Sequence, residues 1–294
     1  MRSVVIVGAG VIGRSVGLAL RRHGVTTYLD DADPESALAG ERCGAGFAAR
    51  PPRQADIAVL AVPPDQVAPV LAEHQKLGTA RCYTDVSGVK VRLHREVRAY
   101  GCDLTSLVSG APVVGGGERP AQPRADLFDG RPWALTPTEA TGNLALNCAL
   151  ELVALCGAVS VLLDPEAHDR AVALVSHAPH LVASLVAARL LGGDESAVRL
   201  AGQDLRDVTR TADGNPERWA QTLTANAGPV ADQLDDWAAE AQAVARELRD
   251  VARSGDANGP VRLRETLRFG VAGRARIREP GHTPALRPER ATDH

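Results

Sequence analysis

SVVIVGAGVIG, residues 3–13, is the stretch that decides the fold. Its first five residues are mostly apolar and β-branched, which predicts a buried strand. Three glycines follow at the spacing G-x-G-x-x-G, and residues 14–22 then continue with apolar side chains at helical spacing. A strand, a glycine-rich turn and a helix in this order predict the first unit of an α/β domain with a doubly wound, mainly parallel sheet.

The glycine-rich turn predicts a binding site for a dinucleotide, because each glycine has a separate physical task. Gly8 permits the tight turn, Gly10 lets the backbone approach a pyrophosphate, and Gly13 lets the helix pack closely on the strand. The helix N-terminus faces the anion and stabilises its charge. The candidate cofactor-binding residues of the turn are Gly8, Ala9, Gly10, Val11, Ile12 and Gly13.

Two further segments at strand ends are expected to border the same cofactor. The second strand ends at Asp30 and Asp31, near the position where an acidic residue binds the adenosine ribose. A carboxylate there repels a 2′-phosphate, which favours NAD over NADP, and we favour Asp31 because it precedes the turn at Pro34. The alternative for either aspartate is that it is a solvated turn residue. The second segment, which follows the third strand, contains Val62, Pro63 and Pro64. The alternative for this segment is a rigid turn without ligand contact.

The pattern of strands and helices divides the chain into two expected domains and a tail. β-branched runs alternate with helical patterns up to about residue 135, and strand signals fade after residue 141. We therefore predict a Rossmann domain over 1–163, an all-α C-terminal domain over 164–274 and a disordered tail over 275–294. The predicted strands are 3–7, 26–29, 57–61, 82–85, 104–108, 133–135 and 159–163, and the last Rossmann helix is predicted over 142–157.

Composition indicates a soluble protein with a small-molecule partner. Apolar residues make up 45% of the 294 residues and the formal net charge is -3, so no bulk field attracts nucleic acid or a membrane surface. The five cysteines have no CxxC spacing and their number is odd, which indicates reduced thiols. The chain starts a strand at once, without an apolar leader, so we expect a cytoplasmic protein.

The longest apolar stretch covers residues 171–191 and predicts a buried helix rather than a membrane span. His177, Pro179, His180 and Arg189 interrupt it, which a lipid environment would penalise. We therefore expect this helix in a domain core or at a subunit interface.

Several stretches resemble the prephenate and arogenate dehydrogenase family over about residues 1–275. They are DVSGVK at 85–90, ADLFDGRPW at 125–133, HDR at 168–170, SHAPH at 176–180, and DVTR at 207–210 followed by Trp219. The resemblance implies NAD-dependent oxidative decarboxylation of a prephenate-like cyclohexadienyl dicarboxylate. Hydride leaves ring C4, and the ring carboxylate leaves as carbon dioxide. The resemblance also implies a homodimer formed through the helical domain, which fits the apolar stretch 171–191.

The resemblance further implies roles for residues in these stretches. Arg210 presents a bidentate guanidinium that suits one substrate carboxylate. Lys90 is one of two lysines in the chain and follows a strand end, which indicates a task that a guanidinium cannot fill. His177 and His180 lie three residues apart, but no third metal ligand is recognisable, so we predict site-lining histidines and no metal. The expected catalytic residues are Lys90, His177 and Arg210, and the expected substrate-binding residues are Ser87, Gly88, Ala111, His180, Asp207, Arg210 and Trp219.

Two positions depart from the family pattern and direct the substrate hypothesis. The family motif Asp-x-x-Ser-x-Lys has Gly88 at its serine, and the motif Gly-x-His-Pro-Met has Ala111 at its histidine. Both missing side chains contact the C4 hydroxyl in the family, and loss of a positioned base typically costs about 10²-fold to 10⁴-fold in rate. An amine at C4 donates its lone pair better than oxygen and can form an iminium without a base. The leading hypothesis is therefore a 4-amino-4-deoxyprephenate dehydrogenase that makes 4-aminophenylpyruvate for p-aminophenylalanine-type antibiotic precursors.

Three other hypotheses stay open at this point. Prephenate or arogenate is the substrate if His177 or a water replaces the missing base. A non-catalytic NAD-binding regulatory protein fits the lost histidine, but not the retention of Lys90, Arg210 and the glycine motif. A β-hydroxyacid or imine reductase shares the architecture, but its lysine or aspartate motif on the interdomain helix is not evident, whereas DVTR at 207–210 is present.

Overall fold

The computed structural model describes residues 1–114, 122–193, 195–255 and 260–277. Packing divides the chain into two compact units, Met1–Leu234 and Asp235–His294. The predicted tail over 275–294 lies outside the described residues from residue 278 onward. The expected boundary between a Rossmann domain and a helical domain after residue 163 stays a prediction, because the elements on both sides of it belong to the first unit.

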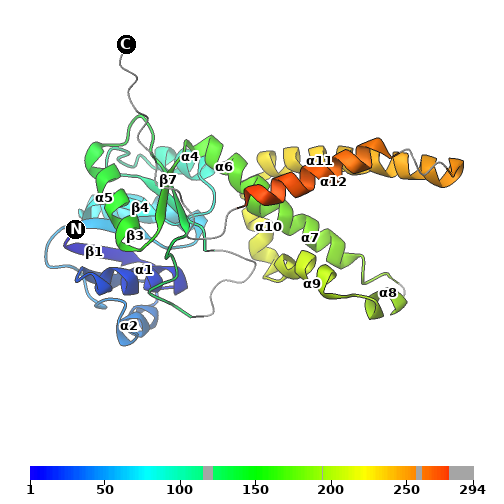
Figure 1. Cartoon of the computed structure of the whole chain (residues 1–294). Coiled ribbons are helices and arrows are strands. Elements are labelled where there is room, and N and C mark those ends of the chain that lie inside the picture. Colours follow the sequence, from blue (N-terminus) through cyan, green and yellow to red (C-terminus); the bar gives the residue numbers. More distant parts are fainter. Residues whose placement is uncertain (115–121, 194, 256–259, 278–294) are drawn as a thin grey trace, which may run out of the picture. The chain divides into compact units, whose positions relative to one another are not determined.

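A four-stranded parallel sheet forms the centre of the first unit (Figure 1). Its strands, in spatial order, are β2 (Thr26–Asp30), β1 (Ser3–Val7), β3 (Ala55–Leu60) and β4 (Ala80–Asp85). Residues 4–7 of the central strand β1 are all buried, as a parallel sheet covered by helices requires. This arrangement confirms the predicted α/β class with a mainly parallel sheet.

Three further strands form a second, mixed sheet. β5 (Ser109–Pro112) pairs antiparallel with β6 (Pro132–Thr136), and β6 pairs parallel with β7 (Val159–Leu162). The prediction of a strand over 104–108 is therefore wrong. Leu107 is the one residue in that range that makes a β-bridge, and its partner is Tyr83 of β4. The sequence of β5 lacks β-branched residues, but a Cβ at Gly110 would lie 2.9 Å from both Asp85 O and Trp133 Nε1. Close packing, and not local propensity, selects this strand.

Helices pack on both faces of the first sheet and complete two apolar cores. α1 (Val11–Arg22) and α5 (Asn143–Leu155) bury Leu20 and Leu152 in one core. α3 (Val67–Leu77) and α4 (Val91–Ala99) bury Leu71 and Leu93 in the other. α2 (Pro34–Arg42) follows β2. Because the four strands are parallel, their carboxyl ends meet at one edge of the sheet, where the polar motifs lie.

Helices also make up the rest of the first unit. They are α6 (Pro165–Val172), α7 (Ala178–Ala188), α8 (Glu195–Arg199), α9 (Gln203–Thr209), the 3₁₀ turn η3 (Arg210–Ala212) and α10 (Pro216–Ala225). A π-helical turn, η2 (Ala173–His177), joins α6 to α7 just before Pro179. Proline has no N–H to continue an α-helical ladder, so the wider turn absorbs the break and sets the direction of His177.

The helical stretch Pro165–Ala188 is the one candidate membrane span within the described ranges, by length and apolar composition, with a mean hydropathy of 1.6 in its window. Only 28% of that window is buried inside the chain. The expectation of a core helix is therefore wrong for the single chain, because Leu174, Val175 and Leu185 are exposed. A subunit interface is the expectation that remains.

The second unit contains the larger part of α11 (Ala227–Ser254) and α12 (Val261–Arg276). The Glu247 carboxylate accepts hydrogen bonds from the backbone N–H groups of Arg262 (3.1 Å) and Leu263 (2.9 Å), and so caps the start of α12. Thr266 donates its hydroxyl to Glu240 over 2.7 Å. Residues 275 and 276, predicted as part of the tail, complete α12 instead.

Candidate active site

The glycine-rich turn after β1 has the geometry that a bound pyrophosphate requires. Gly8 has a φ of +99° and donates its N–H to Asp30 O over 2.8 Å, and a Cβ there would lie 2.5 Å from Ala61 O. A Cβ at Gly13 would overlap the carbonyl oxygen of Gly8, so α1 packs directly on the turn. Gly10 differs, because a Cβ there would meet no atom within 4 Å. The backbone at Gly10 is therefore open to a phosphate at the N-terminus of α1.

Asp31 contacts this turn through its side chain, whereas Asp30 contacts it through its backbone. The Asp31 carboxylate accepts hydrogen bonds from Ala9 N (2.6 Å) and Asp33 N (2.9 Å). Asp33 in turn accepts a hydrogen bond from Glu35 N and caps α2. The carboxylate of Asp31 thus lies beside the glycine-rich turn, where we expect the adenosine ribose.

The turn after β3 packs against the same glycines. Val62 N would lie 3.1 Å from a Cβ at Gly8, and Pro63 and Pro64 begin the 3₁₀ turn η1 (Pro64–Gln66). The structure therefore brings the three expected cofactor segments, 8–13, 30–31 and 62–64, to one edge of the sheet.

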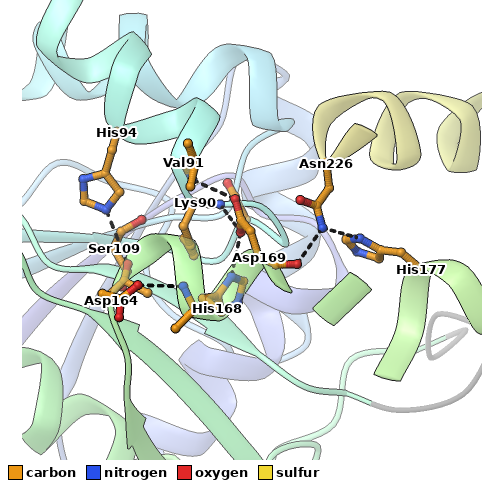
Figure 2. Close-up of polar contacts among 12 residues, drawn as sticks. Lys90, Val91, His94, Ser109, Asp164, His168, Asp169, His177 and Asn226 are labelled. Atoms are coloured by element: carbon orange, nitrogen blue, oxygen red, sulfur yellow. Dashed lines mark hydrogen bonds and ion pairs between the residues drawn. The ribbon is translucent and has the colours of Figure 1, made fainter. Parts of the chain in front are cut away.

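Lys90 lies in a buried polar cluster after β4 (Figure 2). Its ammonium donates to Asp85 over 2.8 Å and to the carbonyl oxygen of Gly110, and both side chains of the ion pair are fully buried. Ser109 donates its hydroxyl to the other carboxylate oxygen of Asp85. Burial lowers the pKa of Lys90, and the neighbouring carboxylate of Asp85 opposes this shift. Lys90 thus ties the end of β4 to β5, and none of its surface is exposed.

Asp169 of α6 links this cluster to the helical segment (Figure 2). Its carboxylate oxygens accept hydrogen bonds from Lys90 N (2.8 Å) and Val91 N (2.9 Å), at the N-terminus of α4, where the helix dipole favours negative charge. His168 Nδ1 lies 2.9 Å from the same carboxylate. Burial raises the pKa of Asp169, but hydrogen bonds from His168, Val91 and Lys90 outweigh it, and the pKa falls below its ordinary value.

Asn226, which follows α10, extends these contacts to His177. Its Nδ2 donates to the backbone oxygen of Asp169 over 2.8 Å and lies 3.0 Å from His177 Nδ1. The ring of His180 stacks on Trp219 at a centroid distance of 3.6 Å, and His177 meets the edge of the same indole at 6.5 Å. Burial lowers the pKa of His177 to about 4 and also lowers the pKa of His180. The two histidines therefore share one aromatic partner, as site-lining residues would.

Two buried polar atoms of expected site residues have no hydrogen-bond partner among the described residues, Ser87 Oγ and His180 Nδ1. A bound polar ligand would satisfy such atoms. Next to Ser87, a Cβ at Gly88 would meet no atom within 4 Å. Ala111 is buried in β5, next to the carbonyl of Gly110 that accepts from Lys90. The two positions that depart from the family motifs thus flank one hydrogen-bonded cluster.

Arg210 begins η3, and its side chain is exposed. Its guanidinium makes no hydrogen bond or ion pair with the rest of the described chain, so it is available to an anionic group of a ligand. Asp207 accepts a hydrogen bond from Gln203 over 3.0 Å within α9. Within the part of the chain that the structure describes, no group of three or more His, Cys, Asp or Glu side chains could hold a metal ion.

The sequence alone indicates no role for Asp85, Asp169 or Asn226. Asp85 and Asp169 stand inside stretches that carry the family resemblance, but the bond from Lys90 N to Asp169 spans 79 residues and leaves no local pattern. Asn226 follows a helix, where asparagine is typical of an ordinary cap. Its contact with His177 spans 49 residues, so no spacing rule reveals it.

A parallel sheet with an open glycine-rich turn, followed by helices that carry buried histidines and a free guanidinium, defines a dinucleotide-dependent dehydrogenase. The chain belongs to the prephenate dehydrogenase family. The model of the prephenate dehydrogenase nucleotide-binding domain matches residues 16–162, and the model of the prephenate dehydrogenase dimerization domain matches residues 164–269. The resemblance found in the sequence is therefore confirmed.

Individual relatives agree with this family. The chain is 48% identical over 284 residues to "Probable prephenate dehydrogenase NovF" of Streptomyces niveus, which covers 94% of this chain and 78% of that protein. It is 25% identical over 297 residues to "Prephenate dehydrogenase" of Bacillus subtilis, covering 97% of this chain and 79% of the relative. The crystal structure of prephenate dehydrogenase from A. aeolicus, in complex with hydroxyphenyl propionate and NAD+, has the same fold, with a TM-score of 0.80 at 24% identity over 95% of this chain and 99% of that one.

The protein is therefore a NAD-dependent dehydrogenase of the prephenate dehydrogenase type, as expected, and not a β-hydroxyacid or imine reductase. The match to the nucleotide-binding domain of this family supports the expected NAD cofactor. The match to a dimerization domain supports self-association.

Proposed function

We propose that the protein is a NAD-dependent 4-amino-4-deoxyprephenate dehydrogenase that forms 4-aminophenylpyruvate. One observation carries the proposal: Gly88 and Ala111 occupy the positions of the serine and histidine that contact the C4 hydroxyl in the family. A Cβ at Gly88 would meet no atom within 4 Å, so steric exclusion does not account for the missing serine. A substrate that does not need a serine and a histidine at these two positions would account for their absence.

The reaction balances without a proton-accepting residue when the C4 substituent is a neutral amine. The C4–H bond breaks, and the hydrogen leaves with both electrons as hydride, for which NAD would be the acceptor when bound. The nitrogen lone pair stabilises the positive charge at C4 as an iminium. The bond between C1 and its carboxylate then breaks and carbon dioxide leaves. The electron pair of that bond completes the aromatic ring and restores the neutral amine.

A C4 hydroxyl makes different demands on the site. Oxygen stabilises the positive charge less well than nitrogen, so the hydroxyl must pass its proton to a base as hydride leaves. Gly88 and Ala111 have no group that accepts a proton. The same residues therefore favour an amine over prephenate as the substrate. An amine that is protonated at neutral pH must first lose that proton to the solvent.

The exposed guanidinium of Arg210 suits bidentate binding of one substrate carboxylate, as the resemblance implies. Ser87, His180 and Trp219 would line the substrate, because Ser87 and His180 hold polar atoms without partners and His180 stacks on the indole. We assign Lys90 a positioning role in place of the expected catalytic one, because its ammonium is buried against protein oxygens.

The cofactor would lie along the edge formed by the three segments 8–13, 30–31 and 62–64. The open backbone at Gly10 fits a pyrophosphate, and the carboxylate of Asp31 fits ribose hydroxyls better than a 2′-phosphate. These residues would hold NAD, and the bound cofactor would supply the hydride acceptor.

We also propose a cytoplasmic homodimer formed through the helical segment. The exposed side chains of Leu174, Val175 and Leu185 would be covered in such a dimer. The product has the carbon skeleton of p-aminophenylalanine, so we place the enzyme in the formation of antibiotic precursors of that type.

The decisive experiment follows NADH formation by the purified protein with NAD and, in parallel, prephenate, arogenate and 4-amino-4-deoxyprephenate. We expect kcat/KM for the amino compound to exceed that for prephenate by at least about tenfold, a difference of about 1.4 kcal/mol in transition-state stabilisation. A preference for prephenate or arogenate would overturn the proposal and favour tyrosine biosynthesis. Absence of turnover with all three would favour the regulatory hypothesis.

A substitution sharpens this test, because the space beside Gly88 can hold a serine. We expect Gly88→Ser to leave stability unchanged and to raise turnover of prephenate relative to the amino compound several-fold. An unchanged ratio would mean that the missing serine does not set the choice of substrate.

A further inference from the structure

The contact between Asn226 and His177 defines where the proton of this histidine sits. The backbone oxygen of Asp169 can only accept, so the Asn226 atom that lies 2.8 Å from it is the amide nitrogen Nδ2. The same nitrogen lies 3.0 Å from His177 Nδ1. Its second hydrogen therefore points at Nδ1, which must accept it and cannot itself carry a proton.

We propose that Asn226 is a positioning residue that holds His177 neutral, with its proton on Nε2, so that His177 donates a hydrogen bond to the substrate and does not act as a general base. This inference deepens the proposed function and rests on it for the identity of the substrate. It removes His177 as a replacement for the missing family histidine, since Nδ1 is occupied and Nε2 has no free lone pair.

The surroundings of His177 favour the same state. Asn226 is 3% exposed and His177 4%, so an imidazolium there would be poorly solvated, and burial lowers the pKa of His177 to about 4. The titratable groups that act on the ring are Asp169 and His168 of α6 and His180 of α7. Of these, Asp169 alone favours the charged ring, and its carboxylate already accepts hydrogen bonds from two backbone N–H groups.

A neutral N–H donor also suits the proposed chemistry. Hydride loss leaves positive charge on the substrate, and a second positive charge close by would oppose it. Neutral His177 can bind a carboxylate oxygen of the substrate without adding that charge. The positive charge needed for the dicarboxylate then comes from Arg210, whose guanidinium is exposed and has no partner among the described residues.

The tautomer can be measured directly, without any substrate. Long-range proton–nitrogen correlation spectra of the protein labelled with ¹⁵N-histidine identify which ring nitrogen carries the proton, and His177→Asn assigns the signals. We expect an unprotonated Nδ1 and a protonated Nε2 that persist from about pH 8 down to about pH 5.5, about one unit below the ordinary histidine pKa. A proton on Nδ1, or an imidazolium at neutral pH, would overturn the proposal.

Asn226→Asp reverses the contact, because the introduced carboxylate can only accept. We expect the proton to move to Nδ1 and the pKa of His177 to rise by at least about one unit. The freed lone pair on Nε2 should lower the kcat/KM ratio of amino compound to prephenate by about tenfold. The matched control is Asn215→Asp at the opposite end of α10, where the side chain accepts from Arg218 N over 2.9 Å and aspartate caps equally well.

The spectra test the role of Asn226 and the kinetics test the identity of the substrate, so either hypothesis can be overturned without the other. If the wild-type tautomer is as expected but prephenate is the better substrate, the proposed substrate is wrong and the role of Asn226 stands. If Asn226→Asp leaves the tautomer unchanged, or Asn215→Asp alters it equally, the role of Asn226 is overturned. Should Asn226→Asp not fold, the wild-type spectrum decides alone.

Discussion

The glycine-rich turn and the buried contacts from Lys90 to His177 are two polar regions of the same unit, and they are built in opposite ways. The turn takes its polar groups from residues 8–13 and from the end of the neighbouring parallel strand β2, and its backbone at Gly10 faces open space. In the second region, the contacts that run through Asp169 and Asn226 join residues up to 79 positions apart, and the groups satisfy one another. We therefore expect a ligand to complete the first region, and the second region to fix the side chains that a ligand meets.

This difference separates substitutions that should alter the fold from those that should alter binding. A group already paired in a buried cluster leaves an unsatisfied partner when it is removed. Removal of a group that faces open space leaves no unsatisfied partner. The following experiments test that division.

The largest effect is expected for Lys90→Met, which leaves the Asp85 carboxylate buried without its cation. Loss of one partner of a buried ion pair typically costs about 3–5 kcal/mol, and urea unfolding monitored by circular dichroism would measure it. The control is Lys76→Met, at the other lysine of the chain, which is exposed near the end of α3. A stable Lys90→Met protein that has lost only turnover would contradict the positioning role and restore a catalytic one.

A pH-dependent loss of stability comes next. The folded-state pKa of His177 is about 4 against an ordinary value of 6.5, so the unfolded chain binds more protons between these values and stability falls as the pH decreases through this window. The full shift corresponds to about 3 kcal/mol. Urea unfolding at several pH values should give a steeper dependence for the wild type than for His177→Asn. Equal slopes would mean that His177 is not held neutral by the fold.

Two glycines of one turn should behave differently when each is replaced by alanine. Gly13→Ala forces a Cβ against the carbonyl of Gly8, and we expect a loss of about 1–3 kcal/mol in unfolding free energy. Gly10→Ala meets no atom within 4 Å, so stability should change by less than about 0.5 kcal/mol while the Kd for NAD rises about tenfold. Calorimetric titration with NAD measures the second effect. Normal NAD affinity in Gly10→Ala would mean that the pyrophosphate does not approach this backbone.

The smallest change is expected for the choice of cofactor. Asp31→Asn removes the negative charge that lies beside the glycine-rich turn, so the preference for NAD over NADP, measured as a ratio of Kd values, should fall about fivefold to tenfold. Asp30→Asn serves as the control, because Asp30 contacts the turn through its backbone oxygen. A larger effect at Asp30 would assign the ribose contact to that residue instead.

Local sequence patterns were sufficient for the first region. The strand at residues 3–7 and the glycine spacing predicted the sheet and the turn, and the carboxylate of Asp31 lies beside that turn. The place of the cofactor stays a prediction. Every contact there joins segments that lie close together along the chain or at neighbouring parallel strand ends. Such contacts follow from periodicity and from the geometry of a βαβ unit.

Tertiary structure alone decided the second region. The sequence marked Lys90 and His177 by resemblance, but only packing buried Lys90 against Asp85 and turned Nδ1 of His177 toward Asn226. Packing also placed the fifth strand at residues 109–112, which have little β propensity, instead of at 104–108. It left the apolar helix around residues 171–191 partly exposed. The physical reason is that burial and pairing depend on contacts between segments far apart in the sequence, such as Lys90 with Gly110 and His177 with Asn226, and no local pattern of side chains records those partners.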